Sequence, residues 1–256
     1  MIEVNNLEKS FDDVQVLKGI STTFEEGKTS LIIGSSGAGK TVFFKCLLGL
    51  YEPTSGEIIY DGDNSANDTK ESKQERRKNI GTVFQYSALL DFLTVEENVM
   101  FPLEMFSDLS RSEMMDRAHE VLKRVNLNEE SFKQYPAEIS GGMQKRVAIA
   151  RAVVTRPKYL FCDEPNSGLD PATATVIDNL IQDLTKEYNI TTVINSHDMN
   201  SVIEIGEKII FLSKGLKAWE GTNQEILHTE QEDVFNFVYN SDLMKKVREA
   251  LIREGK

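Results

Sequence analysis

The stretch SLIIGSSGAGKTVFFKCLLGL, residues 30–50, decides the fold of this chain. It begins as an apolar strand, passes through a glycine-rich turn that ends in a lysine and a hydroxyl residue, and continues as an apolar segment of helical character. This order matches the phosphate-loop pattern. The glycines let the backbone curl so that N–H groups face an anion, and the following helix presents the positive end of its dipole. We therefore expect a phosphate site at the start of this helix.

The residues of this loop have distinct chemical roles. Lys40 supplies a mobile cation for the β and γ phosphates, and the Thr41 hydroxyl supplies a ligand for the Mg²⁺ ion that bridges them. A chance glycine-rich turn would not be expected to lie between a strand and a helix in this way. The predicted phosphate-binding residues are Gly34, Ser35, Ser36, Gly37, Ala38, Gly39, Lys40 and Thr41.

A second element, YLFCDE at residues 159–164, is an apolar strand that ends in two carboxylates. Ligands of open α/β sheets bind beyond the carboxyl ends of the strands, so both acids are delivered to such a place. Asp163 would accept from the hydration shell of Mg²⁺, and Glu164 would orient or polarise the attacking water. The two elements predict phosphoryl chemistry, but many nucleoside triphosphatases share them, including kinases and GTPases.

The composition is that of a globular protein able to bury a substantial core. Of the 256 residues, 40% are hydrophobic and 27% are charged. Polar residues interrupt every apolar run before the roughly 20 residues that a membrane span needs, and the N-terminus resembles no export signal, so a cytoplasmic protein is expected. Cys46 and Cys162 lie in a predicted helix and a predicted buried strand, where reduced core thiols are expected. The net charge of −12 argues against nucleic acid as a partner.

Short apolar runs alternate with helical patterns, which predicts an α/β fold with a mostly parallel sheet. The runs are residues 30–33, 80–84, 159–162, 191–195 and 209–212. Residues 2–24 read as antiparallel strands, and residues 58–63 as a short strand with an Asp-Gly turn, so a smaller β layer is expected. Helical patterns over residues 111–125 and 141–154 indicate an inserted helical lobe.

The predicted boundaries follow from these patterns. The α/β core is expected over about residues 1–85 and 157–221, the helical lobe over about residues 86–156, and a helical tail over residues 222–256. The charged segment 64–78 is predicted to be a solvated loop and the start of a helix. Apolar residues at rough helical spacing between 233 and 253 indicate a helix in the tail, which we expect to pack on the body rather than against a partner.

The run ISGGMQKR, residues 139–146, followed by VAIARAVV and the acid-ended strand, resembles the signature of ABC (ATP-binding cassette) ATPases. Ser140 is predicted to cap a helix at which Gly141 and Gly142 expose backbone N–H groups to an anion. In the family that anion is the γ-phosphate of ATP held by the opposite subunit. The resemblance covers roughly residues 2–221. It implies a RecA-like phosphate-loop core with an antiparallel β subdomain and an inserted helical subdomain.

Four further positions match the family's pattern. Gln85 would contact Mg²⁺ and the lytic water from a loop that senses the transporter, and His197 would contact the γ-phosphate and hold the water with Glu164. Residues 167–170, which end in Asp170, resemble the loop that bridges the two sites of a dimer. Phe11 matches the aromatic that stacks on adenine, where the family more often has Tyr. The implied cofactors are ATP and Mg²⁺, and the implied metal ligands are Thr41, Gln85 and Asp163.

Two features are similar to the ATPases of lipid transporters of the Mla type, which serve MCE-domain proteins. The first is Met143, where the family commonly has Gln, followed by a basic pair. Either Gln144 and the neighbouring backbone suffice there, or this site engages ATP differently. The second is the segment 84–95, whose Leu89, Leu90 and Phe92 would line a groove for a permease helix or else lie in the core. ATPases for lipoprotein release, macrolide or amino-acid transport share much of this pattern.

The resemblance implies a homodimer that sandwiches two ATP molecules, each between the phosphate loop of one copy and the signature of the other. Closure and hydrolysis would drive permease subunits on separate chains, at the inner face of the cytoplasmic membrane. Phospholipid is the expected substrate, with an MCE-domain protein as a further partner. The alternative is a non-transport ABC ATPase, such as an iron–sulfur assembly scaffold subunit, which shares every catalytic motif. A nucleic-acid-handling ABC protein ranks last, since the sequence carries neither a long coiled-coil insertion nor a tandem second cassette.

Overall fold

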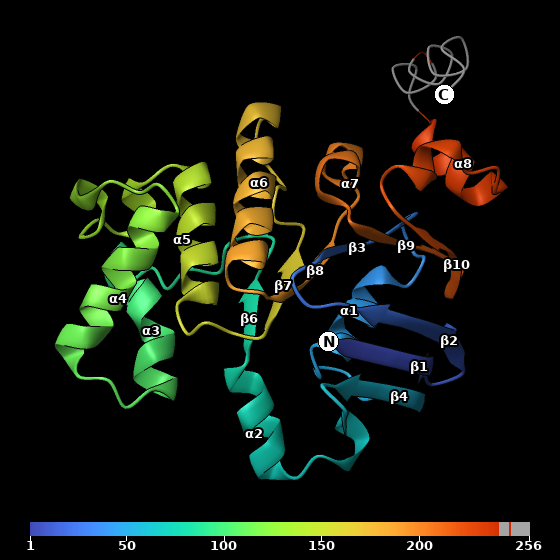
Figure 1. Ribbon diagram of the computed structural model, residues 1–256, viewed down its shortest axis with the longest axis horizontal. Coiled ribbons are helices and arrows are strands. Elements are labelled where there is room, and N and C mark those ends of the chain that lie inside the picture. The colour runs from blue at the N-terminus through green and yellow to red at the C-terminus, as the bar shows by residue number, and fades with distance from the viewer. Residues whose placement is uncertain (241–245, 247–256) are drawn as a thin grey trace. The chain divides into compact units, whose positions relative to one another are not determined.

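A computed structural model describes residues 1–240 and residue 246 of the chain (Figure 1). The described chain forms two compact units. Unit 1 comprises residues 1–23, 30–66 and 195 onward, and unit 2 comprises residues 24–29 and 67–194. Most of unit 2 is therefore inserted between two segments of unit 1. The domain boundaries expected from the sequence divide the chain differently and stay a prediction.

Unit 1 contains a four-stranded sheet with the order β2-β1-β4-β5. Its strands are β1 (Ile2–Phe11), β2 (Val14–Phe24), β4 (Ser55–Tyr60) and β5 (Asp63–Asn64). β1 runs antiparallel to β4, and Ile2 lies opposite Tyr60. Ile2 and Val4 of β1 are buried, because the alternate side chains of a strand lie on one face, and Leu7 is buried after a register shift between Asn5 and Glu8. The predicted smaller β layer is confirmed.

Unit 1 also contains strands in the order β10-β9-β3. β3 runs parallel to β9, and β10 runs antiparallel to β9. β3 is buried along its whole length, as its apolar run predicted. These elements and the helices of the unit are β3 (Thr29–Gly34), α1 (Lys40–Leu47), α7 (Met199–Ile205), β9 (Lys208–Ser213), β10 (Leu216–Gly221), the 3-10 helix η4 (Glu225–His228) and α8 (Glu232–Val238).

Helix α8 covers the first part of the helix predicted for the tail. α8 ends at Val238, where Tyr239 leaves helical geometry and its hydroxyl donates to Leu227 O at 2.5 Å. The Phe237 ring lies 5.3 Å from the Phe211 ring of β9, so α8 packs on unit 1 as expected. The later positions of the predicted helix, 244, 247 and 251, lie outside the described residues.

Unit 2 combines a sheet segment of order β8-β7-β6 with helices. β6 runs parallel to β7, and Val83 lies opposite Cys162. The fold prediction of an α/β protein with a largely parallel sheet is confirmed. The elements are α2 (Lys70–Lys78), β6 (Ile80–Val83), α3 (Val95–Phe106), α4 (Arg111–Arg124), α5 (Gly141–Val153), β7 (Tyr159–Asp163), α6 (Pro171–Glu187) and β8 (Thr191–Asn195), with 3-10 helices η1 (Ser65–Asn67), η2 (Glu129–Ser131) and η3 (Pro136–Glu138).

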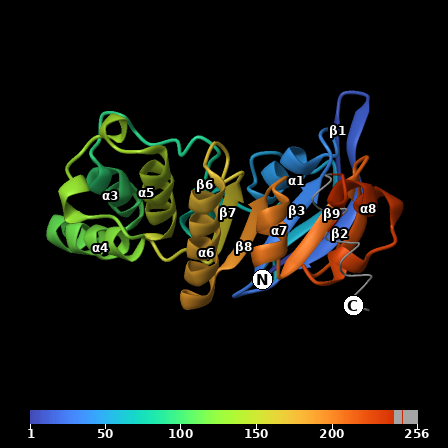
Figure 2. The same ribbon diagram turned by 90° about the horizontal axis from the view of Figure 1, so that it is seen from above.

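The predicted helical lobe consists of α3, α4 and α5, which lie side by side in both Figures 1 and 2. The sequence predicted α4 and α5 to within one residue. α3 was not predicted, although it begins at a capping box in which Thr94 Oγ1 accepts from Glu97 N and the Glu97 carboxylate accepts from Thr94 N. α2 exposes its charged side chains, in agreement with the solvated helix start predicted there.

Helix α5 approaches β6 so closely that the strand needs a glycine. A Cβ added to Gly81 would lie 2.1 Å from Ala152 O and 3.1 Å from Pro157 Cγ. The missing side chain thus lets the helix backbone rest directly on the strand backbone. α5 also contacts α6, so it connects the helical lobe to the sheet of unit 2.

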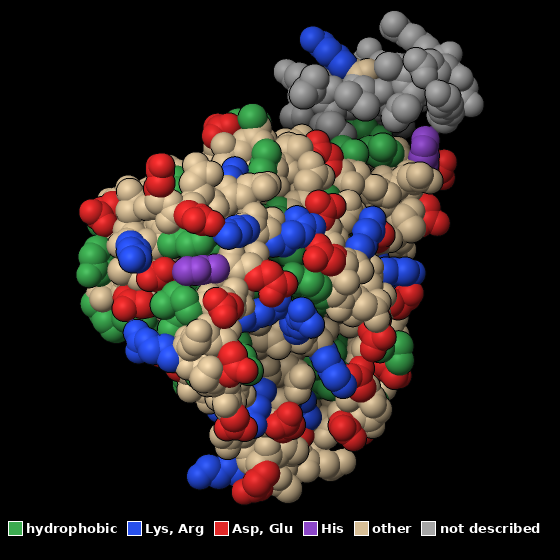
Figure 3. Space-filling view, turned by 60° about the vertical axis from the view of Figure 1, so that its left-hand side comes forward, with side chains coloured by type: hydrophobic (Ala, Val, Ile, Leu, Met, Phe, Trp, Pro, Cys, Tyr) green, Lys and Arg blue, Asp and Glu red, His purple; other side chains and the backbone are tan. Residues whose placement is uncertain are grey.

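Figure 3 shows the face of the molecule that comes forward on the left of Figure 1, with acidic and basic side chains interspersed rather than gathered in one field. Within residues 1–240, every helix is too short or too polar to cross a bilayer. Cys46 and Cys162 are both buried free thiols, as predicted, and burial raises the pKa of Cys46 to about 11.

We expect Gly81→Ala to lower the free energy of unfolding by about 3 kcal/mol, because the new methyl group would meet backbone that cannot move away cheaply. Gly62→Ala is the control, since Gly62 has a positive φ of 92° but open space around it, and the left-handed strain there costs about 1 kcal/mol. Urea denaturation measures both. Equal losses would contradict the close packing of α5 on β6.

Candidate nucleotide-binding site

The phosphate loop of unit 1 has the backbone geometry of an anion cradle. It follows β3 and leads into α1, which begins at Lys40. Gly37 and Gly39 have φ values of 77° and 100°, a left-handed region that glycine adopts without strain. A Cβ on Gly39 would also lie 3.0 Å from Leu17 Cδ2. The path of the loop therefore requires the glycine spacing seen in the sequence.

The Lys40 side chain folds back against this loop. Its Nζ donates to Gly34 O at 2.7 Å and to Ser35 O at 3.1 Å. Thr41 and the tip of the loop are exposed. A cation, exposed backbone N–H groups and the positive end of α1 are thus gathered where a phosphate would bind.

The predicted switch histidine is anchored beside the phosphate-loop strand. The Ser196 N–H donates to Ile32 O of β3 at 3.2 Å, and the Asp198 N–H donates to Ser196 Oγ at 3.0 Å. Ser196 is buried, whereas His197 is exposed. The chain therefore presents His197 beyond the carboxyl end of β3, in the same unit as the phosphate loop.

The predicted adenine platform is a pair of rings. Phe11, at the end of β1, makes an edge contact with Tyr51, with centroids 5.2 Å apart. Lys9 Nζ lies 4.8 Å from the centroid of Phe11, and Lys45 Nζ lies 5.3 Å from that of Tyr51. The two cation–π contacts hold both rings in place. Tyr51 was not predicted as part of this platform, because ring contacts between residues 40 positions apart leave no local sequence pattern.

The two carboxylates lie at the end of β7 in unit 2. Asp163 is the last residue of the strand, and Glu164 follows it with a φ of 48°, which is strained for a residue with a side chain. The turn that holds it is closed by the Ser167 N–H, which donates to Glu164 O at 3.1 Å. Strain of this kind is frequent at functional sites, where the surrounding structure enforces it.

Gln85 and Glu164 leave the sheet at the same edge. Val83 of β6 lies opposite Cys162 of β7, and each of the two predicted residues comes two positions later on its own strand. Because the strands are parallel, both side chains emerge at their carboxyl ends. The structure thus brings these two predicted residues to one edge of unit 2.

Gln85 also connects two loops of the predicted site. Its Nε2 donates to Ser167 Oγ at 3.1 Å, which joins it to the loop that ends in Asp170. Asp170 caps α6 by accepting from Thr173 N at 3.1 Å and from Thr173 Oγ1 at 2.6 Å. These hydrogen bonds hold the pKa of Asp170 below its usual range. The structure assigns Asp170 a capping role, and its contact with nucleotide stays a prediction.

The signature segment begins α5 as predicted. Ser140 Oγ accepts from Met143 N at 3.3 Å, which confirms the cap. Gly141 is exposed, and no atom lies within 4 Å of the place where its Cβ would be. Gln144 Nε2 donates to Pro136 O at 2.9 Å. The Gln144 amide is therefore engaged within the chain and does not replace the polar side chain that the family commonly has at position 143. The donors that remain for an anion are the backbone N–H groups at the start of α5.

These features define a phosphate-loop protein of the α/β class whose residues fit ATP with Mg²⁺. The fit rests on the left-handed glycines, on Lys40 and on the exposed helix start. Within the described residues, no three His, Cys, Asp or Glu side chains cluster as a metal site. The predicted Mg²⁺ ligands include only one such residue, Asp163, together with the Thr41 hydroxyl and the Gln85 amide.

The family model described as "ABC transporter" matches residues 17–167, more than half of the chain. Among curated relatives, the methionine import ATP-binding protein MetN of Vibrio vulnificus (strain YJ016) is 37% identical over 243 residues, which cover 93% of this chain and 70% of that protein. MetN of Desulfitobacterium hafniense (strain Y51) is 36% identical over 259 residues, which cover 99% of this chain and 75% of that protein.

Two solved structures share the fold. The dimeric post-hydrolysis state of the ATP-binding cassette MJ0796, bound to ADP and Pi, has a TM-score of 0.78 at 33% identity and covers 87% of this chain and 99% of its own. cbiO1 from Clostridium perfringens, part of the ABC transporter complex cbiONQ, has a TM-score of 0.84 at 29% identity and covers 99% of this chain and 96% of its own. The chain belongs to the ABC transporter family. It is an ATPase that uses ATP with Mg²⁺.

Sequence reasoning missed two residues that touch the glutamine loop, the segment 84–88. Lys145 and Arg151 of α5 both donate to backbone carbonyls there. Their only sequence signal was a cation at an inward-facing position of a helix with few polar residues. The sequence alone could not show which groups these two cationic side chains contact.

We expect Lys40→Ala to weaken ATP binding about tenfold to a hundredfold, since a charge-assisted contact with the phosphates is lost. Lys28→Ala is the matched control, because Lys28 pairs with Glu25 just before β3 begins, whereas the loop follows the end of that strand, and it should leave the affinity unchanged. Isothermal titration with ATP and Mg²⁺ measures both dissociation constants. An unchanged affinity in Lys40→Ala would refute the role of this lysine.

Proposed function

We propose that this chain works as a homodimer and powers a permease that lies on separate chains. A groove in unit 2 carries this proposal. It has a volume of about 330 Å³ and lies between β6, the glutamine loop, α3 and α5. The glutamine loop borders both the groove and the edge of the sheet where Glu164 emerges. A partner in the groove would therefore touch the loop that carries Gln85.

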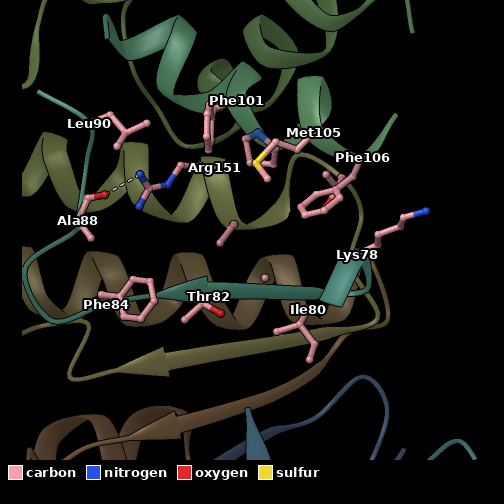
Figure 4. A pocket seen from close by; sticks show the side chains of 14 residues that line it. Lys78, Ile80, Thr82, Phe84, Ala88, Leu90, Phe101, Met105, Phe106 and Arg151 are labelled. Atoms are coloured by element: carbon pink, nitrogen blue, oxygen red, sulfur yellow. Dashed lines mark hydrogen bonds between the residues drawn. The ribbon is translucent and has the colours of Figure 1, made fainter. Parts of the chain in front are cut away.

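The groove is apolar on both walls (Figure 4). Ile80 and Phe84 come from the β6 side, and Phe101, Met105 and Phe106 come from α3. Of these, Met105 is 58% exposed, although large apolar side chains are usually covered. Of the three residues predicted to form a groove, only Leu90 lines it. Leu89 is half-buried and Phe92 is 75% exposed, and both lie outside the lining. Such a surface fits the apolar face of an amphipathic helix.

The charge of the groove defines its partner further. Lys78 and Arg151 line it, and no acidic residue does. A helix that offers an acidic side chain beside its apolar face would complement this surface. We infer that the occupant is a helix of this kind on a cytoplasmic loop of the permease.

The proposed catalytic cycle uses residues of both units. Lys40 and the loop N–H groups would bind the phosphates, Thr41, Gln85 and Asp163 would hold Mg²⁺, and Phe11 would stack on adenine. The start of α5 would bind the γ-phosphate of the ATP held by the opposite copy. Glu164 and His197 would orient the lytic water, and Mg²⁺ would supply charge neutralisation for the phosphates. The dimeric relative bound to ADP and Pi supports a paired arrangement.

Two substrates are candidates, and both depend on the permease. Met143 and the segment 84–95 resemble the Mla type and favour phospholipid, with an MCE-domain protein as partner. The relatives reported above are named for methionine import, which favours an amino acid and gives phospholipid and the MCE partner no support. A non-transport ABC ATPase remains the alternative from another class, since it shares the catalytic residues.

A pull-down of tagged Glu164→Gln with ATP, in detergent, tests the proposed function. Loss of the carboxylate should slow hydrolysis at least about a hundredfold and trap the ATP-bound dimer on its permease. Recovery of a multi-span protein supports the transporter. Recovery of an MCE-domain protein with bound phospholipid would identify phospholipid as the substrate. Recovery of an amino-acid-binding partner would identify an amino acid as the substrate. Recovery of only a scaffold protein without membrane spans would refute the transporter.

The groove is tested by Met105→Glu in the same pull-down. A carboxylate at this apolar, acid-free surface should reduce permease recovery about tenfold or more, while ATP binding stays unchanged. Leu216→Glu is the matched control, because Leu216 is a similarly exposed apolar residue, at 48%, on β10 of unit 1. Equal recovery with both variants would show that the permease docks elsewhere.

A further inference from the structure

The glutamine loop has an unusual backbone. Ser87 and Ala88 have φ values of 62° and 48°, so two successive residues with side chains adopt the left-handed region. Neither residue is glycine, and each conformation costs energy that the surroundings must supply. The Ser87 N–H donates to Phe84 O at 2.9 Å, and the Ala88 N–H donates to Tyr86 O at 2.6 Å, within the loop itself. These local contacts use the carbonyls of Phe84 and Tyr86, and other partners bind the carbonyls of Gln85, Ser87 and Ala88.

The first of those partners is Lys145 of α5. Its side chain is only 5% exposed, and its Nζ donates to Gln85 O. Burial holds the pKa of this ammonium below its usual range, against smaller opposing effects of Cys162 and Glu164. A lysine is rarely buried unless its charge is matched by hydrogen bonds. The Lys145 ammonium therefore hydrogen-bonds to the backbone of Gln85, the residue predicted to contact the metal and the water.

The second partner is Arg151, two turns further along α5. Its Nη2 donates to Ser87 O and its Nη1 to Ala88 O, both at 2.7 Å. The bond to Ala88 is drawn in Figure 4, where Arg151 extends from α5 toward the loop. The rigid fork of a guanidinium suits two neighbouring carbonyls, which one ammonium could not hold in the same way. The two carbonyls belong to the two strained residues.

We propose that Lys145 and Arg151 are positioning residues that clamp the glutamine loop in its left-handed form and so set the place of the Gln85 side chain. The three donated hydrogen bonds offset the backbone strain at Ser87 and Ala88. Without them the loop relaxes, and Gln85 loses its defined position at the edge of the sheet beside Glu164. The hydrogen bonds of both residues to this loop go to its backbone carbonyls.

The clamp also gives a physical route from the groove to the site. Arg151 and Ala88 both line the groove, so a helix seated there contacts the clamp directly. Movement of Arg151 changes the support of Ser87 and Ala88, and Gln85 follows within the same loop. This step rests on the proposed function, whereas the clamp itself does not.

Hydrogen–deuterium exchange of the full chain, without a permease, tests the clamp. In Lys145→Met the amides of Ser87 and Ala88 should exchange about tenfold faster, because a charge-assisted hydrogen bond that stabilises the loop is lost. Arg151→Lys keeps the charge but not the fork and should give a similar increase. ATPase kinetics of both variants should show kcat lowered about tenfold with KM for ATP within about twofold, since Gln85 acts on the water and metal rather than on binding.

The matched control is Arg117→Met. Arg117 of α4 is 13% exposed and donates to Val154 O at 3.2 Å, so it is also a cation on a backbone carbonyl near α5. It should leave exchange at Ser87 and Ala88 unchanged. Native exchange rates in the clamp variants, or equal acceleration in Arg117→Met, would overturn the clamp. If Lys145→Met does not fold, Arg151→Lys and Lys145→Arg test the clamp instead. Lys145→Arg keeps a cation at this position, so the amides of Ser87 and Ala88 should exchange at the native rate. If the exchange results support the clamp but the pull-down recovers no permease, the proposed transporter function is refuted and the clamp is not.

Discussion

The contact of α5 with β6 is the constraint on which unit 2 depends. Gly81 lets the backbone of the helix rest on the backbone of the strand, so the position of α5 is fixed to the sheet rather than to flexible side chains. The signature caps one end of this helix, the clamp cations lie along it, and its later turns line the groove. A shift of α5 would move all three together. One close approach therefore joins the parts that bind phosphate, position the glutamine and meet a partner.

The site of unit 1 depends on a different kind of constraint. The phosphate loop needs left-handed backbone at Gly37 and Gly39, and its cation folds back on Gly34 and Ser35. These are local requirements that the chain satisfies within a dozen residues. In unit 2 the strained residues are not glycines. Ser87 and Ala88 hold left-handed conformations while Arg151 of α5 donates to their carbonyls, and Glu164 holds its conformation in a turn that Ser167 closes. A strained loop that is held by a neighbouring helix can change conformation when a partner moves that helix. The phosphate loop has no such dependence, because its left-handed residues are glycines, which adopt this conformation without strain.

The comparisons and the local motifs answer different questions. The family is shown by a match over residues 17–167, and the phosphate loop, the acid-ended strand and the signature all lie in or adjoin that span. These motifs bind nucleotide, and in the proposed function the transported substrate binds the permease. The predicted lipid subgroup rests on Met143 and on one loop, while the named relatives transport methionine according to their names. Only a partner chain can decide between them.

The sequence by itself determined every strand except β5 and β10, two helices of the lobe, the phosphate loop, the cap at Ser140 and the strand ends that carry Gln85 and Glu164. These depend on short-range spacing of glycines, caps and apolar runs, which local backbone physics dictates. Only the tertiary structure showed the Tyr51 ring beside Phe11, the groove between α3 and β6, the short α8 and the cations on the glutamine loop. Such contacts join residues up to 64 positions apart, as Arg151 and Ser87 are. A local sequence pattern does not predict which distant group a long side chain contacts.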